Sequence, residues 1–248
     1  MNNIKIKRAL ISLSDKSNLK NLLRTLKKFK IEIISSGGTF KYIKKLGFKC
    51  TELNTYTNFP EILDGRVKTL HPKIHAGILH DRQNKKHKNE MNKQKFPSID
   101  LIVVNFYPFQ KVVKNTGNPK KIVENIDIGG PTMVRAAAKN FANVAIITNK
   151  NDYSPLIIEL EKNKGKTSLK FREIMSSKAF GLTAYYDAMI ANWFNNKLNI
   201  QFPERKTIFG RKLKKLRYGE NPHQESSIYI NDYDDKQIGF NQLHGKEL

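Results

Sequence analysis

The stretch GRVKTLHPKIHAGIL, residues 65–79, holds the side chains best suited to chemistry. It places three cations, Arg66, Lys68 and Lys73, beside a threonine and two histidines. Arg66 can grip a phosphate or a carboxylate with two parallel hydrogen bonds, whereas Lys68 is a point charge that can also move a proton. This composition therefore predicts a site for an anionic ligand.

The two histidines of the stretch, His71 and His75, could instead form a metal site, because a helical pair four residues apart can bind zinc. Pro72 interrupts the helix that such a pair needs, unless the proline lies in the first turn. No glutamate completes an HExxH motif, and the neighbouring cations would repel a metal ion. We therefore expect no metal, and we predict that both histidines orient the loop or donate hydrogen bonds.

The segments around this stretch alternate between predicted strands and predicted helices. Apolar runs at residues 4–13, 31–35 and 48–53 are typical of buried strands. Leucines recur at helical spacing over residues 19–29, and a second helix is predicted to end at Leu46. This alternation predicts an α/β fold with a doubly wound parallel sheet, in which ligands bind where strands end and loops enter helices.

Polar residues follow the predicted strands at that ligand-binding edge. SLSDK follows the first strand, SGGT follows the second, and NFY closes a fourth strand over residues 100–107. Taken singly, each residue has a plainer explanation, such as a helix cap, core packing or a solvated side chain, and only their shared placement favours a site. The residues that we expect to meet there are Ser12, Ser14, Lys16, Ser36, Gly37, Gly38, Thr39, Arg66, Lys68, Thr69, Asn105, Tyr107, Asp127, Gly129 and Lys139.

The second half of the chain is predicted to be mostly helical. DIGGPT opens a helix with Pro131 at a first helical position, ahead of a strand over residues 143–148. Apolar positions keep a helical repeat over residues 168–196, where Gly181 is a candidate bend or division. The sequence changes character near residues 197–207, which predicts a boundary there.

The composition limits the classes of partner. A formal net charge of +23 first suggests a nucleic acid, but only nine of the 45 basic residues are arginines, and no RNP, zinc-finger, KH or basic-zipper signature is present. We therefore expect no nucleic-acid partner. No apolar run approaches the length of a membrane span, and the N-terminus lacks the apolar region of a signal peptide. With a single cysteine, Cys50, the sequence predicts a cytoplasmic protein without a membrane partner.

A family resemblance spans essentially the whole chain in order. Its most specific parts are the 65–79 stretch and LRYGENPHQ at residues 216–224. The chain resembles the bifunctional purine biosynthesis family, AICAR transformylase/IMP cyclohydrolase. The motifs that carry the resemblance are SLSDK at 12–16, SGGT at 36–39, GRVKTLHPKIHAGIL at 65–79, NFYPF at 105–109, DIGGPTMVRAAAKN at 127–140 and LRYGENPHQ at 216–224.

The resemblance implies a fold, a division into parts and an activity. Residues 1–148 would form a methylglyoxal-synthase-like core, residues 149–200 its helical extension, and residues 201–248 a linker and the incomplete start of the transformylase domain. The first part would be an IMP cyclohydrolase, in which the carboxamide nitrogen of formyl-AICAR attacks the formyl carbon and water leaves. This reaction would need no metal and no organic cofactor.

The resemblance also implies roles for the predicted site residues. It would place Lys68, Tyr107, Asp127 and Lys139 around the reacting base. Our own hypothesis is that Lys68 and Tyr107 relay protons, while Asp127 and Lys139 orient the carboxamide and polarise the formyl group. Asn105 and Gly129 would lie beside the reacting base. The residues that would hold the ribose phosphate are Ser12, Ser14, Lys16, Ser36, Gly37, Gly38, Thr39, Arg66 and Thr69.

The second activity of the family transfers a formyl group from the co-substrate 10-formyltetrahydrofolate to AICAR. Arg217, Tyr218 and His223 would help to bind AICAR, but the catalytic Lys-His pair and the folate site of the family lie further along than this sequence reaches. We therefore expect no transformylase activity, and we interpret the chain as a truncated product, part of a split gene or a fragment. A homodimer would be weakened, because the family dimerises largely through the transformylase half.

A different class of function stays open from the sequence. Domains with the same fold serve as regulatory modules that bind phosphate ligands, and glycine-rich loops alone do not distinguish a sensor from an enzyme. Tyr107, Asp127 and Lys139 beside Lys68 favour the enzyme, because a sensor needs phosphate donors but no groups that move protons.

Overall fold

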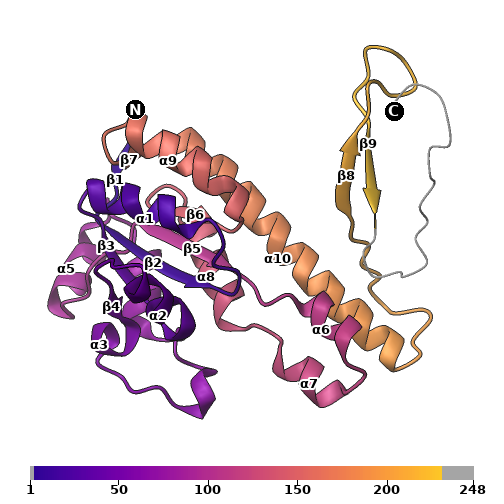
Figure 1. The fold of residues 1–248 in the computed structure, drawn as a ribbon, viewed down its shortest axis with the longest axis horizontal. Helices are drawn as coiled ribbons and strands as arrows, with labels where there is room; N and C mark the ends of the chain where they lie inside the picture. Colours follow the sequence, from indigo (N-terminus) through magenta and orange to yellow (C-terminus); the bar gives the residue numbers. More distant parts are fainter. Residues whose placement is uncertain (1–2, 231–248) are drawn as a thin grey trace. The chain divides into compact units, whose positions relative to one another are not determined.

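A five-stranded parallel sheet forms the middle of the first part of the structure (Figure 1). The computed structural model describes residues 3–230. All neighbouring strands of this sheet pair in parallel, which confirms the predicted α/β fold. Across the sheet the strands lie in the order β4 (Thr51–Glu52), β3 (Glu32–Ser35), β2 (Arg8–Leu13), β5 (Leu101–Asn105) and β6 (Ala145–Ile147).

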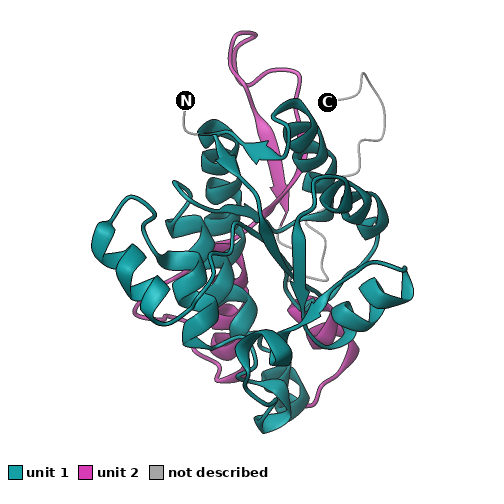
Figure 2. Ribbon diagram, turned by 90° about the vertical axis from the view of Figure 1, so that its left-hand side faces the viewer, with its two compact units in different colours: residues 1–108, 119–183 teal, residues 109–118, 184–248 magenta. Residues whose placement is uncertain are grey.

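Helices lie on both sides of the sheet, as the teal ribbon of Figure 2 shows. The helices of this first part of the structure include α1 (Leu19–Lys28), α2 (Gly37–Lys45), α3 (Leu53–Thr57), α4 (Pro72–Leu79), α5 (Lys85–Lys93), α7 (Pro119–Glu124), α8 (Gly129–Lys139) and α9 (Tyr153–Lys162), of which α7 lies away from the sheet in Figure 1. Short 3-10 turns lie at Leu63–Gly65 and Lys150–Asp152. Helix α1 packs against α9, whereas α4 packs against α8, and α8 also contacts β5 and β6.

The central strands are apolar along their whole length because they are buried on both faces. Residues Leu101, Ile102, Val103 and Val104 of β5 are each at most 1% exposed. A strand covered by helices on both sides has no solvent-facing positions, so its residues do not alternate between apolar and polar. This burial explains why continuous apolar runs marked these strands in the sequence.

The first predicted strand, residues 4–13, is two strands in the structure. Its start, β1 (Ile4–Lys5), pairs antiparallel with β7 (Lys166–Thr167), and only β2 enters the main sheet. Between them, the backbone N–H groups of Lys7 and Arg8 donate to the carboxylate of Asp100 at 2.7 and 2.8 Å. Because Asp100 is only 2% exposed and takes both donors, the chain leaves one sheet and joins another at this point.

Three further details differ from the predicted elements. The third strand is only β4, because the buried Leu53 begins α3 instead of ending the strand. Pro131 is the third residue of α8 rather than the first. A proline is tolerated there because the first four N–H groups of a helix have no acceptor within the helix. Gly181 does not divide the helix, since α10 (Leu169–Lys197) runs through it for 29 residues.

The chain separates into two compact units, which Figure 2 colours teal and magenta. Unit 1 comprises residues 1–108 and 119–183, and unit 2 comprises residues 109–118 and 184–248. Helix α10 begins in unit 1, and its residues from 184 onward belong to unit 2. The domain boundaries inferred from the family resemblance remain predictions.

Unit 2 has an aromatic centre. Phe109, in α6 (Phe109–Asn115), meets Tyr186 and Trp193 edge-on, with ring centroids 6.2 and 6.1 Å apart. Tyr185 and Phe209 form another edge-on pair at 5.2 Å. An antiparallel hairpin of β8 (Arg211–Lys215) and β9 (Ser227–Ile230) follows. Within residues 3–230, no helix combines the length and apolar character needed to span a membrane.

Candidate functional site

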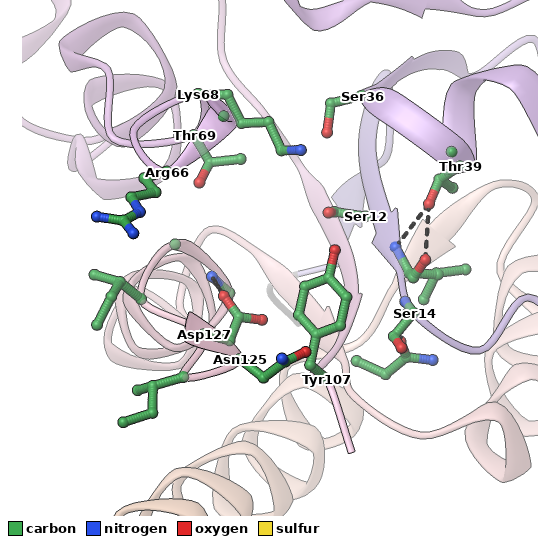
Figure 3. A pocket seen from close by; sticks show the side chains of 18 of the residues that line it. Ser12, Ser14, Ser36, Thr39, Arg66, Lys68, Thr69, Tyr107, Asn125 and Asp127 are labelled. Atoms are coloured by element: carbon green, nitrogen blue, oxygen red, sulfur yellow. Dashed lines mark hydrogen bonds between the residues drawn. The ribbon is translucent and has the colours of Figure 1, made fainter. Parts of the chain in front are cut away.

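A cavity of about 700 Å³ lies in unit 1 where β2 and β5 end. These two strands are neighbours, but the chain continues from β2 toward β3 on one side and from β5 toward β6 on the other. The loops after β2 and β5 therefore part from each other, which opens the crevice in which α/β sheets of this kind bind ligands. Figure 3 shows the side chains that surround it.

The cavity collects nearly all of the predicted site residues of unit 1. Gly37 does not line it, although a Cβ atom at Gly37 would lie 3.5 Å from Lys68 Nζ. Lys139 does not line it either. The predicted residues that line the cavity are Ser12, Ser14, Lys16, Ser36, Gly38, Thr39, Arg66, Lys68, Thr69, Asn105, Tyr107, Asp127 and Gly129.

Lys139 is separated from the other predicted residues by the length of α8. It is the last residue of that helix and is exposed, whereas Gly129 is the first. At a rise of 1.5 Å per residue, the two backbone positions lie about 15 Å apart. The structure thus brings Gly129 but not Lys139 to the cavity.

Hydrogen bonds clamp the loop that follows β2. Thr39 Oγ1 accepts from the Leu13 N–H and donates to the Leu13 carbonyl, both at 3.0 Å (dashed lines in Figure 3). Asn105 Oδ1 accepts from the N–H groups of Ser14 and Asp15, and Asn105 Nδ2 donates to the Asp15 carbonyl. The amide of Asn105 therefore stabilises the conformation of this loop through hydrogen bonds, a role that the sequence did not predict.

The start of α2 forms a cationic corner of the cavity. Ser36 precedes the helix in an extended conformation, and Gly37 takes a left-handed φ of 52° that glycine adopts without strain. A Cβ atom at Gly38 would lie 3.9 Å from Lys16 Nζ. Two lysine ammonium groups, from Lys16 and Lys68, therefore flank the N-terminus of α2, whose own dipole adds positive potential.

A strained turn presents the central cations of the 65–79 stretch. Leu63, Asp64 and Gly65 all have positive φ angles, of 52°, 52° and 83°. Two non-glycine residues in the left-handed region cost free energy, so the surrounding structure must hold them in place. Beyond this turn, the Lys68 side chain points into the cavity in Figure 3.

Asp127 is the carboxylate at the floor of the cavity. Its Oδ1 accepts from the Gly130 N–H at 2.8 Å. Burial raises the pKa of this carboxyl, and the opposing effects of the Gly130 N–H, the Lys68 charge and the Tyr107 backbone only partly offset it. Tyr107 is half exposed, and its ring reaches into the cavity in Figure 3. A carboxyl with a raised pKa beside a lysine and a tyrosine can take part in proton transfer.

The two histidines of the stretch lie at the start of α4 and within it. His71 is the N-cap, and its Nδ1 accepts from the Lys73 N–H at 3.1 Å, with Pro72 in the first turn. His75 makes a hydrogen bond to the backbone of Thr69, and burial lowers its pKa. Within residues 3–230, no group of three or more His, Cys, Asp or Glu side chains is placed to hold a metal ion.

Thr69 and Gly129 fit together tightly. A Cβ atom at Gly129 would collide with Thr69 Oγ1, so this position of α8 requires glycine. Thr69 is only 6% exposed. The glycine therefore lets the first turn of α8 approach the 65–79 stretch and complete one wall of the cavity.

Several cavity residues lie outside every sequence motif. Asp64, Glu124 and Asn125 contribute polar groups, and Val123 and Ile126 contribute apolar ones. They sit in a turn and in a short helix and its following loop, neither of which directly follows a predicted strand. No pattern in the sequence marked them, because they reach the site only when α7 and the turn at residues 63–65 pack beside the cavity in the folded chain.

The predicted AICAR-binding residues of the second activity lie in unit 2. Arg217, Tyr218 and His223 are all exposed, on the loop that joins β8 to β9. The Gly219 N–H donates to the Gln224 carbonyl at 2.7 Å, which closes this loop on itself. The structure therefore places the three residues on one short loop.

Comparisons with known proteins agree with these observations. A family described as the MGS-like domain matches residues 18–132, and one described as the AICARFT/IMPCHase bienzyme matches residues 137–248. The crystal structure of ForH superimposes with a TM-score of 0.68 at 30% identity, over 76% of this chain and 99% of that chain.

Curated relatives extend the match to nearly the whole chain. The bifunctional purine biosynthesis protein PurH of Bradyrhizobium diazoefficiens is 46% identical, over 98% of this chain and 46% of the relative. PurH of Persephonella marina is 45% identical, over 98% of this chain and 48% of the relative. The chain spans about half the length of these relatives. It belongs to the family of bifunctional purine biosynthesis proteins, the AICARFT/IMPCHase bienzymes, and corresponds to their N-terminal portion.

Proposed function

We propose that this chain is an IMP cyclohydrolase, which closes the purine ring of formyl-AICAR to give IMP and water in de novo purine biosynthesis. The observation that carries the proposal is the cavity at the ends of β2 and β5, where cations, hydroxyl groups and a partly buried carboxyl meet. The family relationship supports it, because the curated relatives are bifunctional purine biosynthesis proteins.

The ribose phosphate would bind at the corner beside the start of α2. Ser12, Ser14 and Ser36 offer hydroxyl groups there, and the backbone around Gly38 allows close approach. The Lys16 ammonium at this corner and the Arg66 guanidinium, which also lines the cavity, add charges that suit a phosphate dianion. Thr39 and Asn105 support this corner by fixing the loop after β2.

The reacting base would then lie between Lys68, Tyr107 and Asp127. Ring closure forms a bond from the carboxamide nitrogen to the formyl carbon and makes the formyl oxygen a hydroxyl, which leaves as water after protonation. Lys68 and Tyr107 relay the protons in this proposal, and Asp127 orients the carboxamide.

Two parts of the family's chemistry are less supported. Lys139 retains a role only through the family resemblance, since it does not line the cavity. Arg217, Tyr218 and His223 would bind AICAR only as part of the transformylase activity, whose co-substrate is 10-formyltetrahydrofolate.

The test supplies formyl-AICAR to the purified 248-residue chain and follows IMP formation by ultraviolet absorbance. We expect turnover, and we expect Lys68→Met to lower kcat by about a hundredfold, as loss of a general acid or base does. Lys93→Met removes an exposed lysine at the end of α5 and should leave kcat unchanged. Near-normal turnover by a folded Lys68→Met variant would remove Lys68 from the mechanism.

Tight binding of IMP without turnover would instead favour a regulatory module. A sensor needs the phosphate corner but not the groups that move protons. The same assay on Tyr107→Phe separates the two functions, because loss of the hydroxyl should slow ring closure while IMP binding persists.

A further inference from the structure

The cavity has no excess of positive charge, although the chain as a whole has a formal net charge of +23. A site that binds a phosphate dianion gains affinity from unpaired cations. Here the cavity lining contains as many carboxylates as cations. The cations are Lys16, Arg66 and Lys68, and the carboxylates are Asp64, Glu124 and Asp127.

Glu124 forms an ion pair with the guanidinium of Arg66. It is the last residue of α7, and its carboxylate takes both Nε and Nη2 of Arg66, with a distance of 3.1 Å for the Nε hydrogen bond. Two parallel bonds of this kind are the arrangement that a guanidinium would offer to a phosphate. The carboxylate thus holds the place of a ligand anion.

Glu61 likewise forms an ion pair with Lys68. Its Oε1 lies 3.8 Å from Lys68 Nζ. The carboxylate also lies against Gly65, where a Cβ atom would collide with Oε1. Two glutamates from outside the predicted motifs therefore neutralise the two cations that the 65–79 stretch brings to the cavity.

We propose that Glu124, assisted by Glu61, competes with a ligand phosphate for Arg66 and thereby limits the affinity of the cavity for phosphate-bearing ligands. This inference rests on the proposed function, since it concerns the same site. A phosphate dianion carries more charge than the carboxylate and can displace it from Arg66, whereas a neutral nucleoside cannot. Both members of the Arg66–Glu124 pair are largely exposed, at 66% and 55% of their side chains, so the exchange is weakly opposed.

Binding of three probes to the unmodified chain and to three variants tests the proposal. IMP, inosine and inorganic phosphate are titrated by calorimetry at low ionic strength into the unmodified chain, Glu124→Gln, Glu61→Gln and Glu161→Gln. Glu161 is the matched control, because it forms an exposed ion pair with Lys28 on α1 and does not line the cavity. We expect Glu124→Gln to bind IMP and phosphate about two- to fivefold more tightly, with a smaller gain for Glu61→Gln.

Inosine binding should be unchanged in every variant, and the gain for IMP should shrink as salt is added. The proposal is overturned if Glu124→Gln binds IMP no more tightly than Glu161→Gln, or if inosine gains as much as IMP. Failure of the proposed function gives a different result, since the unmodified chain would then not convert formyl-AICAR to IMP, whatever Glu124→Gln does to IMP binding. Inorganic phosphate would still report whether Glu124 opposes an anion.

Discussion

Among single residues, Asp127 combines partial burial with a position in the lining of the cavity. Its carboxyl has a raised pKa because removal from water disfavours the charged form. The folded state therefore binds a proton more readily at Asp127 than the unfolded chain does, whose carboxyl titrates near 3.9. The stability linked to this group is fully present below the unfolded pKa and is lost as pH rises through the folded pKa.

Replacing Asp127 by Asn should reveal this linkage. Asn keeps an oxygen for the Gly130 N–H but carries no charge, so the variant should be at least as stable as the unmodified chain at pH 7. The difference in stability between the variant and the unmodified chain should become smaller as the pH falls toward 4, because Asp127 then becomes protonated and loses its charge. Thermal unfolding across this range measures the effect, and ring closure by the variant should fall at least about tenfold. A stability difference that is independent of pH would contradict the assignment.

At the scale of elements, the loop after β2 depends on β5. Asn105 is the last residue of β5, and its amide makes three hydrogen bonds to the backbone of Ser14 and Asp15. The neighbouring Asp15 fixes the next turn, because its Oδ1 accepts from the Ser17 N–H and its Oδ2 pairs with Lys150. The strand thus sets the shape of the loop that would receive the phosphate.

Truncation of Asn105 to Ala should loosen this loop. We expect a loss of about 1–3 kcal/mol in the free energy of unfolding, because backbone N–H groups lose their acceptor. The KM for formyl-AICAR should rise more than kcat falls, since the loop binds the phosphate end. Urea unfolding and steady-state kinetics measure the two effects. A fall in kcat at constant KM would instead place the Asn105 amide at the reacting base.

Gly181 offers a prediction for α10. It lies inside a continuous helix, and a Cβ atom there would have no neighbour within 4 Å. Replacement by Ala should therefore raise the free energy of unfolding by about 0.5–1 kcal/mol. Gly129→Ala is the contrasting variant, because its Cβ would collide with Thr69 and should destabilise the chain. Destabilisation by Gly181→Ala would show that α10 bends there in solution.

At the scale of the whole molecule, the two compact units have separate centres. Unit 1 is built on the parallel sheet, whereas unit 2 has the aromatic group of Phe109, Tyr186 and Trp193. Trp193 is the chain's single tryptophan, so its fluorescence reports on unit 2. Far-ultraviolet circular dichroism reports on the helices of both units.

Truncation of Phe109 to Ala tests the packing of unit 2. Phe109 is only 1% exposed, so we expect a loss of about 3–5 kcal/mol, with the Trp193 fluorescence transition moving to lower urea concentration. Phe202 is 92% exposed, and Phe202→Ala should change stability by less than about 0.5 kcal/mol. Equal transitions for the two variants would mean that Phe109 does not stabilise unit 2.

The sequence by itself determined the class of fold, the family and most of the residues around the cavity. Apolar runs predicted β2 and β5, and the polar residues that follow them had to share one edge of a parallel sheet. These inferences succeed because a buried strand and the polar residues that follow it can both be recognised within a short stretch of sequence. Ser12, Ser14 and Asn105 could be named for this reason from the sequence alone.

Only the tertiary structure decided which of these groups meet and what else joins them. Glu61 and Glu124 reach the two central cations from segments without a motif, and Asp100 divides the first predicted strand from a distance of more than ninety positions. Lys139 falls outside the cavity because α8 carries it away from Gly129. Contacts between distant segments depend on how elements fold back on one another, and the spacing of residues within a segment does not encode that.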